Sequence, residues 1–369
     1  MIATVLVPLL AFLIVVAVVA YVGTRLGSLL HVRRRLYLYL ITGVIIVAAL
    51  TTSQLTAAWD SVIIDRVYLV SGVLLGLLFY VFIWLLVFEL LRPLLRIPAR
   101  AAGIAVLLLA TVTTGYGVWN AYRFETRIID ITMPKLMRPI NVAVLADVHM
   151  GGHRGKAYLE RIVAATNAMN PDMIVVPGDL ADSTAILRDE NFAPLAQLKA
   201  PVYFATGNHD TYIDEKRLIA IAQRHGVRVL HNEVVSVEGL QIAGLDYMNA
   251  DDKAFDLHPS PNKTTIEGTL PGIGLDPSRP SILIHHSPVG IPYAEQAGID
   301  LFITGHTHDG GQIFPATVLA KGLFFPYSNG LYRIGKMQLF VSPGIGTFML
   351  PLRVGSQNEL TLLRLRPAR

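Results

Sequence analysis

Small clusters of ionisable residues recur in the second half of this sequence, each directly after a short apolar run. They comprise Asp147 and His149 in "ADVH", Asp179 and Asp182 in "PGDLAD", Asn208, His209 and Asp210 in "TGNHD", His285 and His286 in "HHSP", and His306 and His308 in "TGHTH". One such cluster alone is typical of a turn or a helix cap, whereas five in one chain indicate a common task. Imidazoles and carboxylates in a chain without cysteine suit Mn, Fe or Zn. The pattern therefore predicts a metal centre.

The apolar runs before these clusters have the length of β-strands. They cover residues 141–146, 173–176, 202–206, 281–284 and 301–304. Helical patterns at 156–170 and 214–226 lie between some of them. This alternation predicts a partly parallel sheet with helices outside, in which ligands bind at the carboxyl ends of the strands. In extended backbone, residues two apart point the same way, so the pairs in "DVH" and "HTH" would each present two ligands to one cleft.

The first third of the chain has a different composition from the rest. The 369-residue chain as a whole is 53% hydrophobic and 16% charged, with a mean hydropathy of +0.49, which is too apolar for an ordinary soluble protein. Four stretches are long enough, or nearly so, to cross a bilayer as helices, at residues 3–22, 36–52, 67–91 and 101–118. We predict a transmembrane region at 1–122, a connector at 123–139 and a water-soluble domain at 140–369.

Charges beside the apolar stretches predict their orientation. No positive charge precedes the first stretch and no small-residue cleavage site follows it, so we expect a retained anchor and not a signal peptide. Arginines gather after the first and third stretches, and the loop between the second and third has none. The positive-inside rule then places the soluble domain outside the cytoplasm. Gly72 and Gly76, four residues apart, are interpreted as packing positions within the helical bundle.

The order of the motifs, DxH, GDxxD, GNHD, a single His and GHTH, resembles the calcineurin-like metallophosphoesterase superfamily across residues 140–366. The tail "GLYRIGKMQLFVSPGIGTFMLPLRVGSQNEL" further resembles a subgroup in which four membrane spans precede the phosphoesterase domain. The resemblance implies an α/β fold of four layers, an αββα sandwich with two sheets back to back and helices outside, preceded by a four-helix transmembrane region. It also implies a metal-dependent hydrolase of phosphoric esters.

Carried over residue by residue, the resemblance implies two divalent metal ions, with manganese, iron and zinc as candidates. One ion would bind Asp147, His149, Asp179 and His308, and the other would bind Asp179, Asn208, His286 and His306, so that Asp179 bridges them. His286 is preferred over His285 because it stands two residues before Pro288, as in the family. Water activated by the two ions would attack phosphorus in line.

Further residues would act beside the ions. By the same resemblance, His209 would protonate the leaving oxygen or stabilise the transition state, and Asp182 would orient its ring. Ser183 stands where the protein-phosphatase branch has an arginine that grips phosphate, which disfavours a phosphoprotein substrate. His153 and Arg154 follow the first ligand pair, and either contact the substrate phosphate or are plain surface residues.

The sequence leaves three hypotheses for the substrate. The first is a membrane hydrolase of a lipid-linked phosphate ester or pyrophosphate, in which residues 314–332 line a lipid entry. The alternative for this segment is that it forms strands and core of the second sheet. The second is an anchored phosphodiesterase for soluble nucleotides or small diesters, and the third is a membrane sensor or scaffold whose metal site only binds. A single span would suffice to tether a soluble esterase, so four spans favour the first hypothesis over the second. The complete ligand set and the candidate proton donor argue against the third. The expected partners are a phosphate ester and the bilayer, without nucleic acid.

Overall fold

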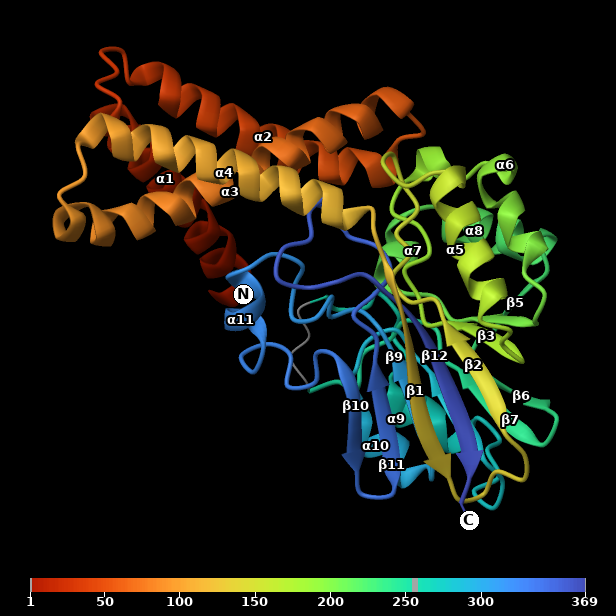
Figure 1. The fold of residues 1–369 in the computed structure, drawn as a ribbon. Coiled ribbons are helices and arrows are strands. Elements are labelled where there is room, and N and C mark those ends of the chain that lie inside the picture. Colours follow the sequence, from red (N-terminus) through yellow and green to blue (C-terminus); the bar gives the residue numbers. More distant parts are fainter. Residues whose placement is uncertain (1, 254–257, 369) are drawn as a thin grey trace.

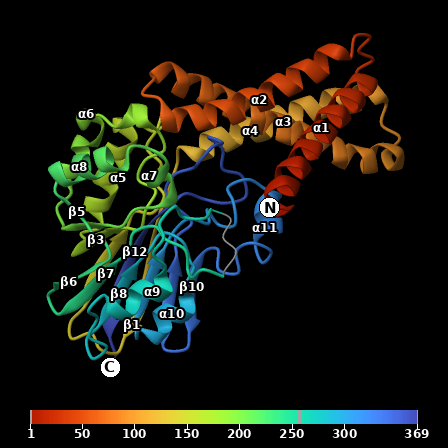
Figure 2. The same ribbon diagram turned by 180° about the vertical axis from the view of Figure 1, so that it is seen from behind.

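The computed structural model describes residues 2–253 and 258–368 of the chain. Figure 1 shows a bundle of long helices that lies across one end of a two-sheet domain and extends beyond it on one side. The view from behind in Figure 2 shows the same two parts in contact along this end.

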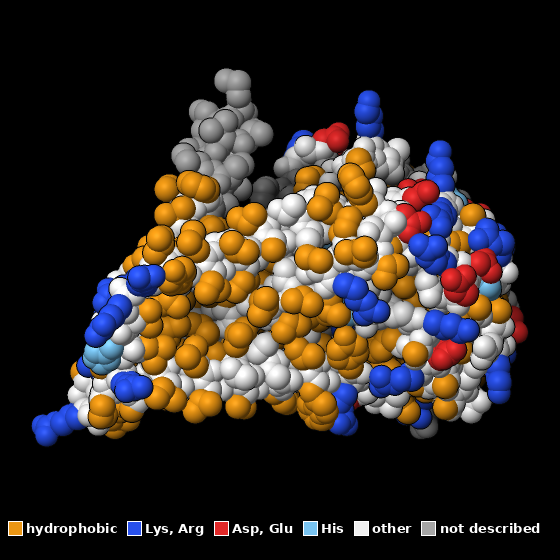
Figure 3. Space-filling model, turned by 90° about the horizontal axis from the view of Figure 1, so that it is seen from above, with side chains coloured by type: hydrophobic (Ala, Val, Ile, Leu, Met, Phe, Trp, Pro, Cys, Tyr) orange, Lys and Arg blue, Asp and Glu red, His pale blue; other side chains and the backbone are white. Residues whose placement is uncertain are grey.

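The four predicted membrane spans are helices, and each extends beyond its predicted bounds. They are α1 (Ile2–Leu29), α2 (Leu36–Ala58), α3 (Val62–Leu95) and α4 (Ala99–Ala121). All four are long and apolar enough to cross a bilayer. Seen from above in Figure 3, the outer face of the bundle is mostly hydrophobic, and Lys and Arg side chains gather at the end farthest from the domain. This distribution is that of a helical membrane region with one basic end.

In the described part of the chain, twelve strands form two six-stranded sheets. The first has the order β1 (Glu125–Met133), β12 (Glu359–Pro367), β2 (Ile140–Val144), β3 (Met173–Val176), β4 (Val202–Phe204), β5 (Val227–Val229). The second has the order β10 (Gly330–Ile334), β11 (Met337–Val341), β9 (Leu301–Thr304), β8 (Ser281–Ile284), β7 (Leu240–Gly244), β6 (Glu233–Val237). Within the stretch expected to be a connector, β1 pairs in parallel with β12 and is an edge strand of the first sheet.

The strands alternate between two buried faces, which produces four layers. Val142 and Val144 of β2 face the second sheet, whereas Ala143 between them faces the outer helices. Short helices cover both outer faces, namely α5 (Lys156–Ala168), α6 (Asp189–Phe192), α7 (Asn208–Tyr212) and α8 (Glu215–Arg224) on the first side and α9 (Ile266–Thr269) and α10 (Ile291–Gln296) on the second, while α11 (Ala316–Ala320) lies apart beside the bundle. The predicted αββα sandwich behind four apolar helices is confirmed.

The bundle and the sandwich interlock through one loop. Leu350 and Leu352, between β11 and β12, are buried in the same apolar cluster as side chains of the membrane helices. Three helix glycines admit this loop: a Cβ atom at Gly76 would lie 2.5 Å from Leu352, and Cβ atoms at Gly72 and Gly117 would also meet loop atoms. The prediction that Gly72 and Gly76 pack within the bundle is therefore wrong, because both make room for a loop of the domain.

Candidate metal centre

The five polar clusters of the sequence follow β2, β3, β4, β8 and β9, at the carboxyl edges of the two sheets. The backbone of five residues there is left-handed, with φ between 46° and 72°, namely at Asp147, His149, Asp179, His306 and His308. The expected extended backbone is therefore wrong, and the side chains converge through tight turns beyond the strand ends. Such conformations cost about 1–3 kcal/mol each and gather at functional sites, where the surrounding structure holds them in place.

One group of ligand atoms consists of Asp147, His149 and His308. The two Nε2 atoms of His149 and His308 are 3.0 Å apart, and the distances to Asp147 Oδ1 are 3.9 and 3.5 Å. Nitrogens bound to one tetrahedral ion at about 2.0–2.1 Å would lie roughly 3.4 Å apart, so this spacing suits a shared cation. The backbone N–H of His306 donates to Asp147 Oδ1 (2.9 Å) and holds the carboxylate in place.

A second group consists of Asp179, His286 and His306. His286 Nε2 lies 3.0 Å from Asp179 Oδ2 and 3.1 Å from His306 Nδ1. On the other side of its ring, His286 Nδ1 donates to the carbonyl oxygen of Pro177 (2.8 Å), which directs Nε2 toward the centre. Asp179 Oδ2 is also 3.7 Å from His149 Nε2, so this carboxylate lies between the two groups.

Asp182 lies beside these groups, and His209 forms a third group of candidate ligand atoms with His149 and Asp179. Asp182 Oδ1 is 2.9 Å from His209 Nδ1 and 2.5 Å from His149 Nδ1, so one carboxylate orients two imidazoles. The backbone N–H of His209 donates to Asp179 Oδ1 (2.9 Å). The His209 side chain is 25% exposed, unlike the buried rings of His149 and His308. Because Nδ1 is engaged by Asp182, a further partner of this ring would meet Nε2.

The charges of these residues reinforce one another. Burial opposes the ionised form of Asp182, but His149 and His209 outweigh it and hold the pKa of this carboxyl well below its usual range. Burial likewise opposes the charge of Asp179, and the surrounding imidazoles again lower its pKa. Burial disfavours the cation of His209, yet the carboxylates of Asp182 and Asp179 prevail and raise its pKa to about 10. A protonated His209 in this position can supply a proton to a leaving oxygen.

His285 does not reach the centre. Its ring lies behind His286, where Nδ1 donates to the carbonyl oxygen of Ser287 (2.9 Å) and the backbone N–H of Met248 points to Nε2 (3.4 Å). Burial lowers the pKa of His285 to about 4. Of the two histidines considered from the sequence, the structure brings only His286 next to the other ligand atoms.

His153 and Arg154 belong to none of the groups of candidate ligand atoms. Arg154 is fully buried, and its guanidinium donates to the carbonyl oxygens of Thr347 and Ala121 (both 2.9 Å) and to Thr347 Oγ1 (2.7 Å). The prediction that Arg154 contacts a substrate phosphate is therefore wrong, because all these contacts join the loop after β2 to α4 and the β11–β12 loop. His153 packs against Arg154 and the ring of Tyr122, outside both groups.

Sequence reasoning assigned no role to three supporting residues. Asp210 accepts four backbone N–H groups, from Gly207 and from residues 179–181, and so fixes the loop after β3. The ring of Phe348 lies 4.9 Å from that of His308 and 6.1 Å from that of His149. Arg353 is fully buried and donates to the carbonyl oxygen of His308 (3.2 Å). Of these three residues, only Asp210 stands in a sequence motif, "GNHD", that indicates a role in the site. The residues around Phe348 and Arg353 form no motif from which their roles could be predicted.

The donor set fits two divalent cations. The Oδ1 atom of Asn208 is buried without a hydrogen-bond partner among the described residues, which is expected of an oxygen that a cation would hold. Its Nδ2 atom donates to Tyr212 Oη (3.3 Å), so the amide is oriented with the oxygen left for a ligand. Nitrogen and oxygen donors without sulfur suit Mn, Fe or Zn.

An apolar surface segment lies next to the site. Within residues 314–325, named the α11 segment here, five side chains are between 50% and 74% exposed: Phe314, Val318, Leu319, Leu323 and Phe324. The ring of Phe325 lies 6.3 Å from that of His306, and Tyr80 of α3 donates to the carbonyl oxygen of Phe314 (3.0 Å). Figures 1 and 2 show α11 beside the start of α1. The alternative that all of 314–332 forms core of the second sheet is wrong, since only its end enters β10.

Comparison with known proteins relates this chain to a family, to relatives in other organisms and to solved structures. The sequence profile of the calcineurin-like phosphoesterase family matches residues 140–310. A "transmembrane protein with metallophosphoesterase domain" from Danio rerio is 32% identical over 329 residues, 80% of this chain and 72% of the relative, and its namesake from Bos taurus is 35% identical over 252 residues, 64% of this chain and 55% of the relative. A solved dimetal phosphatase from Danio rerio overlaps 57% of this chain and 88% of that chain, with 14% identity and a TM-score of 0.35.

Proposed function

This chain belongs to the calcineurin-like metallophosphoesterases that carry transmembrane helices, and from this premise we propose that it hydrolyses a lipid-linked phosphate ester at the membrane surface. The observation that carries the proposed reaction is the position of Asp179 between two His/Asp groups, with His209 beside them. A binding-only scaffold would need neither a shared carboxylate nor a protonated imidazole at the edge of the site.

In this proposal the chain holds two divalent ions. Asp147, His149, Asp179 and His308 hold one, and Asp179, Asn208, His286 and His306 hold the other. When bound, the two ions would lower the pKa of a water molecule and offset the charge of the phosphate oxygens. His209 holds the proton that the leaving oxygen takes up, and Asp182 keeps the His209 ring in position through Nδ1.

The α11 segment supports a lipid-linked substrate. Its exposed Leu323 and Phe324 stand two residues or fewer before Phe325, which contacts the ring of His306. Apolar side chains of this size are expected to enter the interface of a bilayer when they lie beside membrane helices. A phosphate ester that is anchored by its lipid part would then meet the metal groups without leaving the membrane surface.

The reaction class is tested with the full-length protein in detergent. We expect metal-dependent hydrolysis of bis-(p-nitrophenyl) phosphate, its loss after chelation, and recovery when Mn²⁺ is returned. Elemental analysis should find about two metal ions per chain, as two-ion sites of this chemistry require. Protein that hydrolyses the ester equally well after complete chelation would contradict the proposal.

The lipid part of the proposal has its own test. The double variant Leu323→Ser, Phe324→Ser in full-length protein should lose most of its activity on lipid phosphates in vesicles and keep its activity on the chromogenic ester. The control is Met137→Ser, which removes a 92% exposed side chain in the β1–β2 loop at the opposite end of the domain. Equal losses on both substrates would contradict lipid contact and indicate a structural role for the α11 segment.

A soluble substrate is the second candidate, and a cavity of about 650 Å³ favours it. The cavity is lined by polar residues of α8 and of the loops after β5 and β7, including Glu215, Lys216, His231, Asp246 and Asn262. Tyr247 separates it from the centre, with its ring 6.0 Å from that of His286. Wild-type protein that turns over a water-soluble nucleotide diester and ignores every lipid phosphate offered would establish this candidate and dismiss the first.

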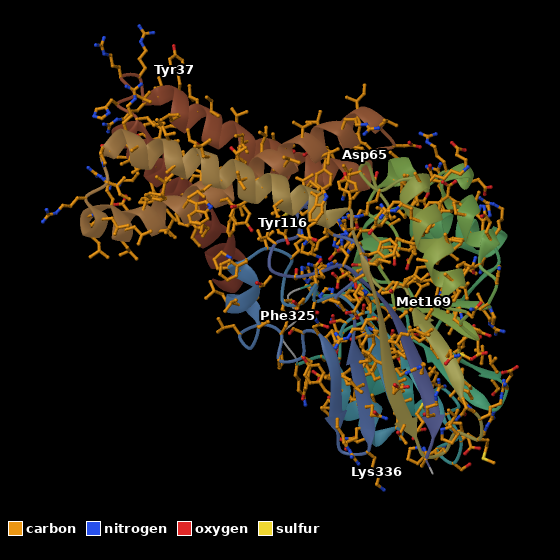
Figure 4. All side chains as sticks on the ribbon, in the orientation of Figure 1. Tyr37, Asp65, Tyr116, Met169, Phe325 and Lys336 are labelled. Atoms are coloured by element: carbon orange, nitrogen blue, oxygen red, sulfur yellow. The ribbon has the colours of Figure 1, made fainter. Side chains whose placement is uncertain are left out.

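We also propose that the domain lies outside the cytoplasm, because the basic ends of the helices lie far from it. The chain has no cysteine, so single cysteines report on topology without interference. An impermeant maleimide added to intact cells should label Lys336→Cys at the tip of the domain (Figure 4) and should not label His31→Cys in the basic loop. The reverse labelling would place the catalytic domain in the cytoplasm.

A further inference from the structure

The end of the bundle where α2 meets α3 is docked onto the loop that carries Asp182. Figure 4 labels Asp65 at this end, where the helices meet the domain. The hydroxyl of Thr184 donates to the carbonyl oxygen of Ala57 (2.5 Å), and Arg188 forms an ion pair with Asp60 (2.8 Å). Contacts from the turn between two membrane helices therefore surround the residues that follow Asp182.

Asp65 makes the most buried of these contacts. It lies in the first turn of α3 and is 4% exposed. The hydroxyl of Ser183 donates to both carboxylate oxygens of Asp65, at 2.8 and 3.0 Å, and accepts the backbone N–H of Ala185 (3.1 Å). Ser183 is the residue directly after Asp182, so the position of this loop is fixed by a carboxylate from a membrane helix.

The same side chain touches a second loop of the site. A Cβ atom at Gly152 would lie 2.6 Å from Cβ of Asp65, which shows how closely the loop after His149 packs against α3. The two loops also join each other, since Met150 and Ala181 form a backbone bridge. Asp65 is thus wedged between the loop that carries His149 and the loop that carries Asp182.

A role in the helix alone does not explain this placement. An acidic side chain in the first turn of a helix is stabilising even when it is exposed to water, so that effect does not require burial. Removing a carboxylate from water is unfavourable unless specific partners compensate. The partner here belongs to the loop that carries Asp182. Asp65 lies inside the apolar stretch of α3, and ionisable residues within membrane-spanning segments are rare and frequently functional.

We infer that Asp65 is a positioning residue of the active site: through Ser183 and Gly152, membrane helix α3 fixes the loops that place Asp182, His149 and His209. This inference rests on the proposed phosphoesterase function. It gives the transmembrane region a part in catalysis, because the soluble domain alone lacks the group that holds the loop of Asp182, and Asp182 orients the ring of His209. Asp65 acts through Ser183 and does not touch the substrate.

The test uses full-length protein in nanodiscs and a series of aryl phosphate diesters whose phenols differ in pKa. Asp65→Ala and Ser183→Ala should each lower kcat about tenfold for the poorest leaving group, with less effect for good leaving groups and little change in KM, since a displaced His209 donates protons less well. If Asp65 acts through Ser183, the double variant should be no slower than the slower single variant. Asp65→Asn keeps an acceptor for the hydroxyl and should restore most of the rate.

A readout without turnover accompanies the kinetics. Titration with Co²⁺, followed by visible absorption, should show one of two equivalents bound about tenfold more weakly in Asp65→Ala and Ser183→Ala, as expected when the support of a ligand loop is lost. The control is Asp60→Ala, which removes a carboxylate of the same turn that faces Arg188 and Arg217. It should leave both the leaving-group dependence and the Co²⁺ titration unchanged.

Several outcomes would overturn the inference. If the losses of kcat in Asp65→Ala and Ser183→Ala add up in the double variant, the two residues act independently and Asp65 does not act through Ser183. A loss in Asp65→Ala that is equal for all leaving groups, or matched by Asp60→Ala, would indicate general destabilisation. A fully active Asp65→Ala with normal Co²⁺ binding would dismiss the role while leaving the proposed function intact. If wild-type protein shows no metal-dependent hydrolysis, the proposed function fails instead. The Co²⁺ titration would then still test Asp65: its role is overturned if Co²⁺ affinity is unchanged in Asp65→Ala, or if the losses of affinity in Asp65→Ala and Ser183→Ala add up in the double variant.

Discussion

The two halves of the candidate metal centre rest on different parts of the molecule. In the half with His286 and His306, the ring of His286 is held within the sandwich, where the carbonyl oxygen of Pro177 accepts from Nδ1 and the ring of Tyr247 lies nearby. This half meets the bundle less directly, through the α11 segment that packs against His306. The half with His149 and His308 is supported by groups that also contact the membrane helices. Asp182 belongs to a loop bound by Asp65, and Phe348 and Arg353 flank a loop that is inserted into the bundle.

This difference shows that the helices are more than a tether. A tether needs a flexible connection and leaves the domain complete without it. Here Leu350 and Leu352 are buried only together with helix side chains, and Asn120 at the end of α4 donates to the carbonyl oxygens of Arg353 (3.1 Å) and Ser356 (3.2 Å). We therefore expect disturbances of the bundle to reach the His149 half of the centre first.

The largest effect should come from the residue that both halves share. Asp179→Asn removes the negative charge between the two groups, so we expect the loss of both metal ions. The fall in kcat should exceed the roughly 10- to 100-fold that follows when one residue supporting a metal ligand is lost. Elemental analysis and hydrolysis of bis-(p-nitrophenyl) phosphate check it. If the variant retains two ions and near-normal turnover, Asp179 does not bridge the two groups, and the centre is not built of two halves that share a carboxylate.

The next effect concerns His209, the proposed proton donor on the His149 side of the centre. His209→Ala should leave the metal content nearly unchanged and slow turnover by about 10²-fold, with the greatest loss for poor leaving groups. Kinetics with phenols of graded pKa measure this dependence. An equal loss for good and poor leaving groups would assign His209 an electrostatic role in place of proton donation.

A pair of core truncations tests the comparison directly. Leu352→Ala and Leu301→Ala each remove a fully buried leucine, one at the bundle and one in β9 of the sandwich, and each should destabilise the protein by about 2–5 kcal/mol. Hydrogen exchange should increase first at residues 147–154 and 179–186 for Leu352→Ala, and at 281–286 and 301–308 for Leu301→Ala. The same pattern of hydrogen exchange in both variants would mean that the two halves of the centre open together and are not supported separately.

The smallest effect belongs to the exposed ion pair at the junction. Asp60 and Arg188 are 38% and 43% exposed, so Asp60→Ala should change the free energy of unfolding by less than about 1 kcal/mol. Thermal unfolding in detergent measures it. A larger loss would show that the rim of the junction, and not only its buried Asp65–Ser183 contact, holds bundle and domain together.

The sequence alone determined the elements and the inventory of the site. Apolar runs of fixed length specify strands and membrane helices through burial, which is a local property, and the ionisable residues after each run are visible in the order of the chain. For this reason the four spans, the five strands and the clusters around Asp147, Asp179, Asn208, His286 and His306 were predictable. The left-handed turns that carry the ligands were not, because their strain is tolerated only where the surrounding fold holds them.

Only the tertiary structure decided which residues support the site. Asp65 is 118 residues from Ser183 in sequence, and the buried Arg154 reaches Thr347 across 193 residues, so no local pattern announces either contact. Residues 125–133 became an edge strand because β12, more than 200 residues later, offered a parallel partner. Gly72 and Gly76 pack against a loop of the domain and not against another helix. The sequence shows that these positions are small enough for close packing, but only the tertiary structure determines which segment packs there.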